Sequence, residues 1–311
     1  SSLVVEVASN DGYLLQYFKE SGVPVLGVEP SGNVAAAAVK KGIPTLVEFM
    51  GQPLGEKLAA EGKKADLIAG NNVVAHVPDI NDFVKGLMLT LKDSGVITLE
   101  FPHLEKQIQF NQFDTIYHEH FSYLSLHSLQ VVFERNGLRI FDVDELTTHG
   151  GSLRIYGCHQ GNKNYAVTDK VLQLKKREEA FGITNINMYK SFQKNIELTK
   201  RKALQFLIKA KEEGKTVVGY GAPAKGNTLL NYCGVRQDFI DFTVDRSAHK
   251  QGMYLPGVHI PILAPEKIYE TKPDYVFILP WNLKEEIEAQ MKEIRSWGGK
   301  FVVAIPSLEV F

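Results

Sequence analysis

The sequence predicts an α/β fold, in which a doubly wound parallel sheet is followed by a second, smaller α/β domain. In the first half, short apolar runs alternate with helical patterns, which is typical of a parallel sheet with helices on both faces. The same alternation resumes after residue 215, beyond a long helical stretch. The length of 311 residues predicts about two domains, and the 44% of hydrophobic residues suffices for two cores.

The elements of the first half follow one another with glycine and proline between them. Strands are expected at residues 3–7, 25–28, 45–49, 66–69 and 95–100. Helices are expected at residues 12–21, 33–41, 53–61 and 80–91. Residues 103–128 hold four of the nine histidines and show no clean period. Two later strands, at 138–143 and 152–157, are expected to extend the sheet.

The second half begins with a long helix expected at residues 187–213, whose apolar residues form a single stripe. The stripe consists of Tyr189, Phe192, Ile196, Ala203, Phe206 and Ala210. A strand-loop-helix unit is then expected at residues 216–230, followed by strands at 239–244, 275–279 and 301–305, and we expect no close sequence repeat between the halves. The expected division is a first domain at 1–165, a helical connector at 166–213 that packs its stripe against protein, and a second domain at 214–311.

Composition limits the partners and the compartment. The chain has 35 basic and 36 acidic residues and a formal net charge of -1, which gives no indication of a nucleic-acid or membrane partner. No apolar run approaches the roughly 20 residues of a membrane span. The two cysteines, Cys158 and Cys233, lie far apart in sequence. This indicates a reducing compartment, argues against a Cys-rich zinc site in this chain, and predicts a cytoplasmic protein.

The first turn carries the strongest sign of a cofactor site. Ser9-Asn-Asp-Gly12 follows the first strand, and Glu29 closes the second strand at a position suited to a ribose diol. The turn lacks the G-x-G-x-x-G spacing that lets backbone approach a pyrophosphate. Its polar side chains suit a ligand with an amino-acid tail, so the pattern favours S-adenosylmethionine over a dinucleotide. The alternative is an ordinary polar turn between a strand and a helix.

The densest group of titratable side chains is Tyr117-His-Glu-His-Phe-Ser-Tyr123, after the fifth strand. Two imidazoles beside a carboxylate and phenols supply general bases and orienting hydrogen bonds. His-x-His without a further ligand at a known spacing is a weak metal signal, so no metal is expected. His76 follows the fourth strand at the same sheet edge and can converge with this segment on one substrate. The alternative is a set of polar residues on an exposed loop.

Two glycine-containing segments are candidate anion sites. His149-Gly-Gly-Ser-Leu-Arg154 can form a simple hairpin, or its backbone N–H groups can approach an anionic ligand. Gly219-Tyr-Gly-Ala-Pro-Ala-Lys225 opens a helix at which N–H groups and an ammonium can meet phosphate. Its spacing is not that of a Walker A loop. A second NAD site is the alternative there, although the third glycine position is Ala or Lys.

Five motifs in chain order resemble those of the sugar C-methyltransferases. They are Glu6-Val-Ala-Ser-Asn-Asp-Gly12, Asn72 to Pro78 with its histidine, Glu119-His-Phe-Ser-Tyr123, His149-Gly-Gly-Ser-Leu-Arg154 and Gly219-Tyr-Gly-Ala-x-Ala-Lys225. These S-adenosylmethionine-dependent enzymes methylate C3 of nucleotide-linked 4-keto-deoxysugars. The resemblance covers nearly the whole chain. Family members usually begin with a small four-cysteine zinc domain, which this sequence lacks.

The resemblance implies a class I methyltransferase domain, with a Rossmann-like doubly wound sheet, followed by a Rossmann-like carboxyl-terminal domain, with substrate at their junction. It implies that the catalytic base is His120, supported by Tyr117, Glu119 and His76. The expected cofactor-binding residues are Glu6, Ser9, Asn10, Gly12, Glu29, Asn71 and Asn72. The expected substrate-binding residues are Tyr123, His149, Gly151, Ser152, Arg154, Gly221, Lys225 and Asn227.

The chemistry of such a reaction explains these residue types. A carbon beside a ketone becomes a nucleophile once its α-proton leaves, and His120 can remove that proton from C3. Glu119 or Tyr117 can orient the reacting groups or stabilise the developing oxygen charge. Two alternatives stay open from the sequence: O-methylation of a sugar or small metabolite, and a non-catalytic protein that binds a nucleotide sugar.

Overall fold

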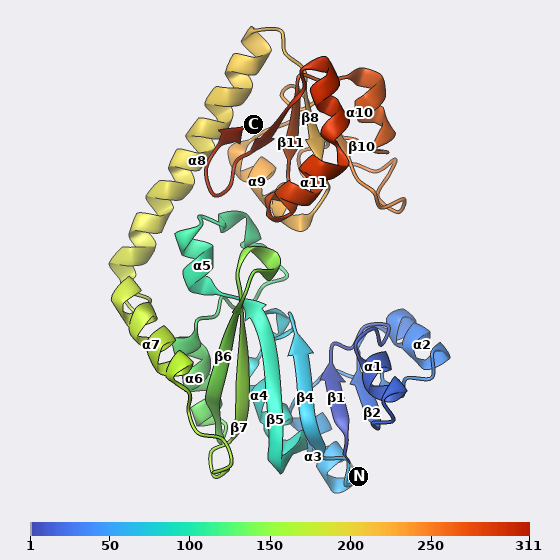
Figure 1. Cartoon of the computed structure of the whole chain (residues 1–311), viewed down its shortest axis with the longest axis vertical. Helices are drawn as coiled ribbons and strands as arrows, with labels where there is room; N and C mark the ends of the chain where they lie inside the picture. The colour runs from blue at the N-terminus through green and yellow to red at the C-terminus, as the bar shows by residue number, and fades with distance from the viewer. Residues whose placement is uncertain (1) are drawn as a thin grey trace. The chain divides into compact units, whose positions relative to one another are not determined.

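The chain folds into two compact units, as the computed structural model of residues 2–311 describes them (Figure 1). The first unit comprises residues 1–105 and 119–184, and the second comprises residues 106–118 and 185–311. The chain therefore contributes to the second unit twice, once in a short excursion and once with its whole carboxyl-terminal part.

The first unit is built on a seven-stranded sheet in the order β3-β2-β1-β4-β5-β7-β6. The strands are β1 (Val4–Val7), β2 (Val25–Val28), β3 (Thr45–Leu46), β4 (Ala65–Asn71), β5 (Leu91–Pro102), β6 (Leu138–Leu146) and β7 (Ser152–His159). Strands β1 to β5 pair in parallel, whereas β7 runs antiparallel to both β5 and β6. The antiparallel pair is the late extension that the sequence predicts, and the predicted α/β fold class is confirmed.

Helices cover both faces of this sheet, as a doubly wound fold requires. They are α1 (Leu15–Glu20), α2 (Gly32–Lys40), α3 (Gln52–Ala60), α4 (Ile80–Thr90), α6 (Leu126–Arg135) and α7 (Asp169–Phe181). Alternate residues of β1 show the division: Val4 shares a core with Leu15 of α1, and Val5 shares a larger core with Leu87 of α4. The short helix α5 (Leu104–Gln109) spans the point where the chain passes from the first unit to the second.

Three expectations for the first unit need correction. The strand expected at 45–49 is only two residues long, and the helix expected at 12–21 begins at Leu15. The helix starts late because Ala8, Asn10 and Gly12 have φ of 56°, 49° and 78°, which keeps the turn outside the helical region. The segment 103–128 contains the start of α6, where Ser125 forms a capping box with Ser128.

The second unit repeats the parallel arrangement on a smaller scale, in the order β10-β9-β8-β11-β12-β13. Its strands are β8 (Val217–Tyr220), β9 (Thr243–Val244), β10 (Ile262–Leu263), β11 (Tyr275–Ile278), β12 (Lys300–Val303) and β13 (Glu309–Val310). All neighbours pair in parallel except β13, which is antiparallel to β12. Its helices are α8 (Ile186–Glu212), α9 (Ala224–Cys233), α10 (Glu266–Thr271) and α11 (Lys284–Gln290).

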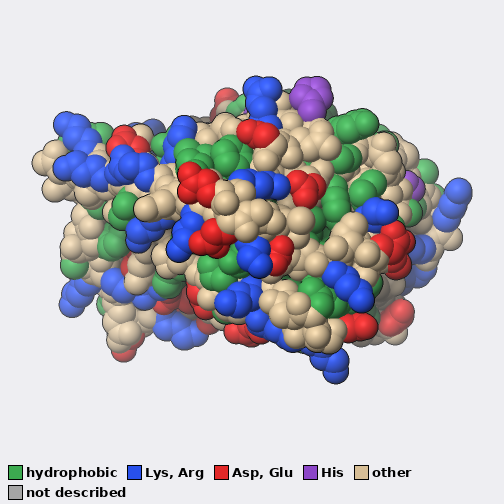
Figure 2. Space-filling model, turned by 90° about the horizontal axis from the view of Figure 1, so that it is seen from above, with side chains coloured by type: hydrophobic (Ala, Val, Ile, Leu, Met, Phe, Trp, Pro, Cys, Tyr) green, Lys and Arg blue, Asp and Glu red, His purple; other side chains and the backbone are tan. Residues whose placement is uncertain are grey.

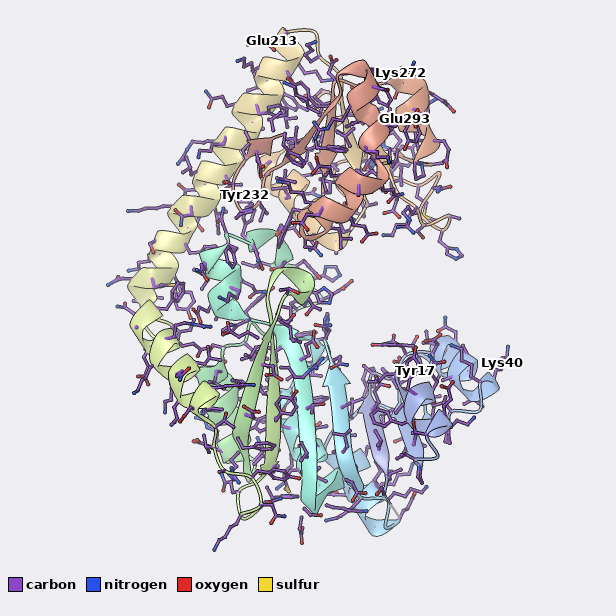
Figure 3. All side chains as sticks on the ribbon, viewed as in Figure 1. Tyr17, Lys40, Glu213, Tyr232, Lys272 and Glu293 are labelled. Carbon is purple, nitrogen blue, oxygen red and sulfur yellow. The ribbon has the colours of Figure 1, made fainter. Side chains whose placement is uncertain are left out.

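The long helix α8 belongs to the second unit and covers one face of its sheet. Ile196, Ala203 and Ala210 of the predicted stripe are buried in one core with Phe277 of β11. Figure 3 labels Glu213, which directly follows the last residue of this helix. Phe192 and Phe206 are partly buried and pack against the same core, so the predicted stripe is confirmed for five of its six residues.

The excursion of residues 106–118 adds to that same core. Phe113 packs edge-on against Tyr232 of α9, with ring centroids 5.3 Å apart, and Figure 3 labels Tyr232. Asn111 Nδ2 donates to Thr199 Oγ1 at 2.6 Å. The observed units thus differ from the expected ranges: residues 106–118 leave the first unit, and the expected connector divides, with α7 in the first unit and α8 in the second.

Charged side chains of both signs are intermixed on the face seen in Figure 2, in keeping with the balanced composition. Within residues 2–311, no helix combines the length and the apolarity needed to cross a membrane.

The packing of α8 predicts that Phe206→Asn lowers the free energy of unfolding by about 2–4 kcal/mol, because it removes an aromatic ring and adds a polar group at the sheet face. Phe206 packs against the core of the second unit, 5.1 Å from the ring of Tyr275. Phe192→Asn should act in the same direction. Urea denaturation measures the effect, and Ile208→Asn, on an exposed position of the same helix, is the control. Equal loss in the Phe206 and Ile208 variants would contradict this packing.

Candidate active site

A cavity of about 500 Å³ opens in the first unit where β1, β2 and β4 end. Polar side chains and apolar ones share its lining: Asn10, Tyr13, Glu29, Glu48, Phe49, Met50, Asn71, Asn72, His76 and Phe83 are among them. The carboxyl ends of parallel strands are where doubly wound sheets bind ligands. The volume lies in the range of sites for small molecules and cofactors.

Glu29 forms the polar floor of this cavity and joins two loops. Its backbone follows β2, and its side chain is 6% exposed. Oε2 accepts a hydrogen bond from the N–H of Asn10 at 3.1 Å, and Oε1 accepts one from the N–H of Ser31 at 2.8 Å. Each carboxylate oxygen can accept about two hydrogen bonds, so both retain capacity for the hydroxyls of a ribose. The geometry fits the expected role of Glu29.

Asn10, Asn71 and Asn72 line the cavity on either side of that carboxylate. Asn10 and Asn72 have φ of 49° and 54°, a region that asparagine adopts more readily than most residues. Asn72 Nδ2 lies 3.2 Å from Nε2 of His149. Its Oδ1 is buried with no protein partner, so it is an acceptor available to a ligand.

Three of the expected cofactor residues, Glu6, Ser9 and Gly12, are not among the residues that line the cavity. Ser9 is fully buried, and its Oγ lies where a side chain on Gly27 would have to go, 2.5 Å from an added Cβ. A Cβ on Gly12 would come within 2.9 Å of Ile43. Ser9 and Gly12 therefore shape the turn that presents Asn10.

Glu6 is a buried acid in the middle of β1. Its side chain is 1% exposed, and Oε2 has no hydrogen-bond partner. Burial raises the pKa of this carboxyl from 4.5 to about 8. A ligand ammonium would compensate such a group, and S-adenosylmethionine carries one on its amino-acid tail. The residues of this site therefore fit the cofactor that the sequence predicts.

The two histidines that the sequence singles out converge beside the cavity. His76 ends the short helix η1 (Val74–His76) and lines the cavity, and its ring centroid is 4.7 Å from that of His120 in an edge-on arrangement. The N–H groups of Phe121 and Ser122 donate to the carbonyl of Ala75 at 2.9 and 3.2 Å, which ties the two segments together. The ring of Tyr123 also lies edge-on to that of His120, with centroids 5.9 Å apart.

The loop between β6 and β7 completes the polar edge of the first unit. Glu100 of β5 accepts from Thr148 Oγ1 at 2.8 Å and from Nη2 of Arg154 at 2.7 Å. Ser152 is buried and donates from Oγ to the carbonyl of Thr148, so its hydroxyl stabilises the loop. Gly151, with φ of 125°, makes the turn possible.

Four of the predicted site residues belong to the second unit: Tyr117, Gly221, Lys225 and Asn227. Glu119, where the chain re-enters the first unit, is exposed.

Lys225 is engaged inside the second unit. Its Nζ lies 2.5 Å from Oδ1 of Asn282 and 4.5 Å from the ring centre of Trp281. Trp281 Nε1 in turn donates to Oδ2 of Asp114 at 2.8 Å. Burial lowers the pKa of Lys225, while the charge of Asp114 opposes that shift. Burial also raises the pKa of Asp114 to about 7. The predicted phosphate contact would have to compete with this network.

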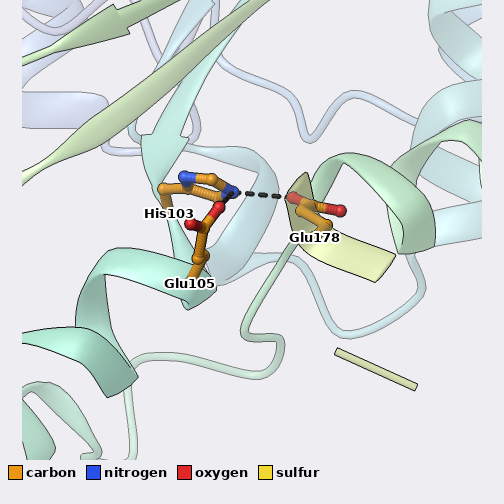
Figure 4. Close-up of side chains that lie close together, drawn as sticks. All are labelled: His103, Glu105 and Glu178. Carbon is orange, nitrogen blue, oxygen red and sulfur yellow. Dashed lines mark hydrogen bonds and ion pairs between the residues drawn. The ribbon is translucent and has the colours of Figure 1, made fainter. Parts of the chain in front are cut away.

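A second buried cluster, shown in Figure 4, holds His103, Glu105 and Glu178 close enough together to bind a metal ion in principle. Each carboxylate already has protein partners. His103 Nε2 lies 2.7 Å from Oε1 of Glu178, which also accepts from the N–H of Leu126 at the start of α6. Arg177 Nε donates to both oxygens of Glu105 at 2.9 and 3.1 Å. The cluster therefore caps α6 and fastens α7 to the sheet.

Sequence reasoning missed several residues of the cavity. Phe49 is 81% exposed at the cavity, and it was hidden within the strand expected at 45–49. Tyr13 and Met50 were likewise assigned to no site. An aromatic residue just beyond a strand end is a signal that can mark a ligand edge. Glu100 gave no such signal, because only the pairing of β5 with β7 brings it to Arg154.

Buried acids predict that the free energy of unfolding depends on pH. Folding raises the pKa of Glu6 from 4.5 to about 8 and that of Asp114 from 3.8 to about 7. Between its unfolded and its folded pKa, each carboxyl binds more protons in the folded chain than in the unfolded chain. The contribution of the protonated carboxyls to the free energy of unfolding is therefore full below about pH 4, and it is lost as the pH rises to about 8. The slope is at most about 1.4 kcal/mol per pH unit for each group.

Urea denaturation between about pH 5 and pH 8 measures this slope. Glu6→Gln and Asp114→Asn should each flatten it, and Glu20→Gln, on an exposed position of α1, should leave it unchanged. Slopes equal to that of the wild type in both buried variants would contradict the assignment.

Two family models match consecutive parts of the chain. A methyltransferase domain matches residues 1–143, and a C-methyltransferase C-terminal domain matches residues 147–306. The chain is 38% identical over 308 residues to the C-methyltransferase NovU of Streptomyces niveus. The matched region covers 99% of this chain and 73% of NovU.

Solved structures overlap with about half of the chain. The magnesium protoporphyrin IX methyltransferase of Synechocystis, solved with bound S-adenosylmethionine, is 16% identical and covers 51% of this chain and 71% of its own, with a TM-score of 0.39. An S-adenosylmethionine-dependent methyltransferase of Anabaena variabilis is 14% identical and covers 51% and 77%, with a TM-score of 0.42.

The sequence relationships, and not these partial overlaps, show what the protein does. The protein is an enzyme that uses S-adenosylmethionine as cofactor. It transfers the methyl group to carbon, so the alternatives of O-methylation and of non-catalytic binding do not apply. The chain belongs to the S-adenosylmethionine-dependent C-methyltransferase family.

Proposed function

We propose that this enzyme methylates C3 of a nucleotide-linked 4-keto-deoxysugar. The observation that carries the proposal is the His76–His120 pair, with ring centroids 4.7 Å apart, at the edge of the cofactor cavity. A carbon nucleophile beside a ketone requires a base close to the methyl donor, and a pair of imidazoles at that edge supplies one. The five motifs shared with sugar C-methyltransferases support the choice of substrate class.

In this proposal the cofactor is held by Glu29, Asn10 and Asn72, which line the cavity, while Glu6 lies buried beneath the turn and is proposed to compensate the ammonium of the amino-acid tail without lining the cavity. When bound, S-adenosylmethionine supplies an electrophilic methyl group. The protein contributes a fixed orientation, because Glu29 is already held by the N–H groups of Asn10 and Ser31.

His120 takes the proton from C3 of the substrate, and the electron pair of that C–H bond passes into an enolate with its charge on O4. His76 and Tyr123, whose rings lie edge-on to the imidazole of His120, orient it for the transfer. Glu119 and Tyr117 are proposed to assist as the resemblance implies, by orienting substrate or by hydrogen bonding to O4. The proton leaves His120 to solvent at the end of the cycle.

The substrate proposal is tested with a panel of nucleotide-linked sugars incubated with S-adenosylmethionine. Mass spectrometry should detect one added methyl group on a 4-keto-deoxysugar, and NMR should place it on C3. The matched control is the corresponding 4-hydroxy sugar, whose C3 proton is not acidic and which should remain unmodified. Methylation of the hydroxy sugar, or of no nucleotide sugar at all, would contradict the proposal.

If Glu29 binds the ribose diol, Glu29→Ala should weaken S-adenosylmethionine binding by about 1.5–3 kcal/mol, the scale of hydrogen bonds to a charged group. Calorimetry measures the affinity, and Glu20→Ala, on an exposed position, is the control. A thermal melt checks that the variant folds, because the N–H groups of Asn10 and Ser31 lose their acceptor. Equal affinity in the folded Glu29 variant and the wild type would refute this placement.

If His120 is the base, His120→Ala should lower the rate of methyl transfer by about 10²–10⁴-fold and leave cofactor affinity nearly unchanged. It should also slow the exchange of the C3 hydrogen with deuterated water when S-adenosylhomocysteine replaces the cofactor. His127→Ala is a control, since this histidine lies in the first turn of α6. Exchange that persists in His120→Ala and vanishes in His76→Ala would assign the base to His76 instead.

A further inference from the structure

The second unit repeats the backbone arrangement that surrounds Glu29 in the first. In the first unit, Gly27 and Glu29 donate their N–H groups to Pro44 and Leu46, at 2.8 and 3.0 Å. In the second, Thr243 and Asp245 donate to Pro261 and Leu263, at 2.9 and 3.0 Å. The residue that follows the first strand of each unit also makes the same hydrogen bond to the end of the second strand. The N–H of Ala8 donates to the carbonyl of Val28, and the N–H of Gly221 donates to the carbonyl of Val244.

A short local sequence likeness accompanies this match, although no close repeat links the halves as a whole. Val28-Glu-Pro-Ser31 corresponds to Val244-Asp-Arg-Ser247, and Ile43-Pro-Thr-Leu46 corresponds to Ile260-Pro-Ile-Leu263. In each case an acid follows the second strand and a serine comes two residues later. Asp245 therefore occupies in the second unit the position that Glu29 occupies in the first.

The hydrogen bonds of the two acids are the same. Oδ2 of Asp245 accepts from the N–H of Ala222 at 2.8 Å, and Oδ1 accepts from the N–H of Ser247 at 2.8 Å. The donors lie in the same two loops as Asn10 and Ser31, although Ala222 stands one residue nearer to its strand than Asn10 does. The side chain is 15% exposed, its Oδ2 also forms an ion pair with Nζ of Lys250 at 3.6 Å, and each oxygen keeps capacity for a further hydrogen bond. A carboxylate at the end of the second strand of such a unit is suited to a ribose diol.

A cavity of about 220 Å³ opens in front of Asp245. Pro223, Pro280, Leu283 and Ile287 give it apolar walls on which a flat ring can lie, and Arg246 and Gln290 are polar residues of its lining. Its volume is less than half of that in the first unit, so it admits a nucleoside more readily than a larger cofactor.

A dinucleotide does not fit the loop that precedes α9. In dinucleotide sites the second glycine of the motif leaves room for a pyrophosphate. Here the space beside Gly221 is taken by Pro280, whose Cδ lies 2.6 Å from where a Cβ would stand. The glycine is required by protein packing, and the N–H of Ala222 is already bonded to Asp245.

We propose that the second unit carries a binding site for a ribonucleoside, in which Asp245 accepts hydrogen bonds from the 2′ and 3′ hydroxyls and the base lies against the apolar wall. This site lies within the second unit and is separate from the cofactor cavity of the first. Two sources supply such a ligand: a free nucleoside, or the nucleoside half of a ribonucleotide-linked sugar.

The test uses the intrinsic tryptophan fluorescence of the whole chain. The chain has two tryptophans, Trp281 and Trp297, and both belong to the second unit. Trp281 stands between Pro280 and Leu283, which line the cavity. Adenosine should produce a saturable change with a dissociation constant of about 1 mM or lower. 2′-Deoxyadenosine, which lacks one of the two hydroxyls, should bind about tenfold more weakly.

Variants assign the site. Asp245→Asn should weaken adenosine about 10–100-fold, and Asp238→Asn, an exposed aspartate of the same unit, should leave the affinity unchanged. Glu29→Gln should also leave this signal unchanged, which separates the site from the cofactor cavity. A thermal melt checks the fold of Asp245→Asn, and the comparison of adenosine with 2′-deoxyadenosine on the wild type needs no variant.

Three results would overturn the proposal: no saturable change with adenosine, equal binding of adenosine and 2′-deoxyadenosine, or a signal that is lost in Glu29→Gln and kept in a folded Asp245→Asn. Competition by uridine diphosphate glucose distinguishes the sources. Displacement of adenosine identifies a site for a sugar nucleotide, and failure to displace it identifies a site for the free nucleoside.

Discussion

The carboxylate that closes the second strand of each parallel sheet organises the ligand edge of its unit. Glu29 holds the N–H groups of Asn10 and Ser31, and thereby joins the turn after β1 to the start of α2. Without this acceptor, two backbone donors at the rim of the cavity would have to find other partners, at a cost of about 1–3 kcal/mol each. The same side chain thus stabilises the loops and presents its remaining lone pairs to a ligand.

The excursion of residues 106–118 packs into the core of the second unit, and the candidate base, His120, follows it closely in the sequence. It delivers Phe113 to the core and Asp114 to the indole of Trp281. The chain returns to the first unit at Glu119, one residue before His120. There the N–H groups of Phe121 and Ser122 bind the carbonyl of Ala75, which brings His120 beside His76. Within the first unit, the position of the candidate base is therefore set by these backbone hydrogen bonds.

Buried polar atoms without a hydrogen-bond partner lower the stability of the folded chain at two positions beside the cofactor cavity. Glu6 Oε2 and Asn72 Oδ1 are both buried without a hydrogen bond in the described part of the chain. Such groups are costly unless a ligand completes them. In contrast, the carboxylates of Glu105 and Glu178 are paired with Arg177, with His103 and with the first turn of α6, so they serve the fold.

The sequence by itself determined the α/β class, the strands from Val4 to Val28, the apolar stripe of α8 and the family. These depend on local periodicity and on motifs, which are properties of short segments. It also indicated that His76 and the segment of His120 meet at one edge, because strand ends of a parallel sheet lie together. Only the tertiary structure decided which residues line the cavity: Phe49 lies there because β3 ends at Leu46, and Ser9 does not because it packs on Gly27. Only the pairing of strands made Asp245 the counterpart of Glu29, since hydrogen bonds between segments far apart in sequence leave no period to read.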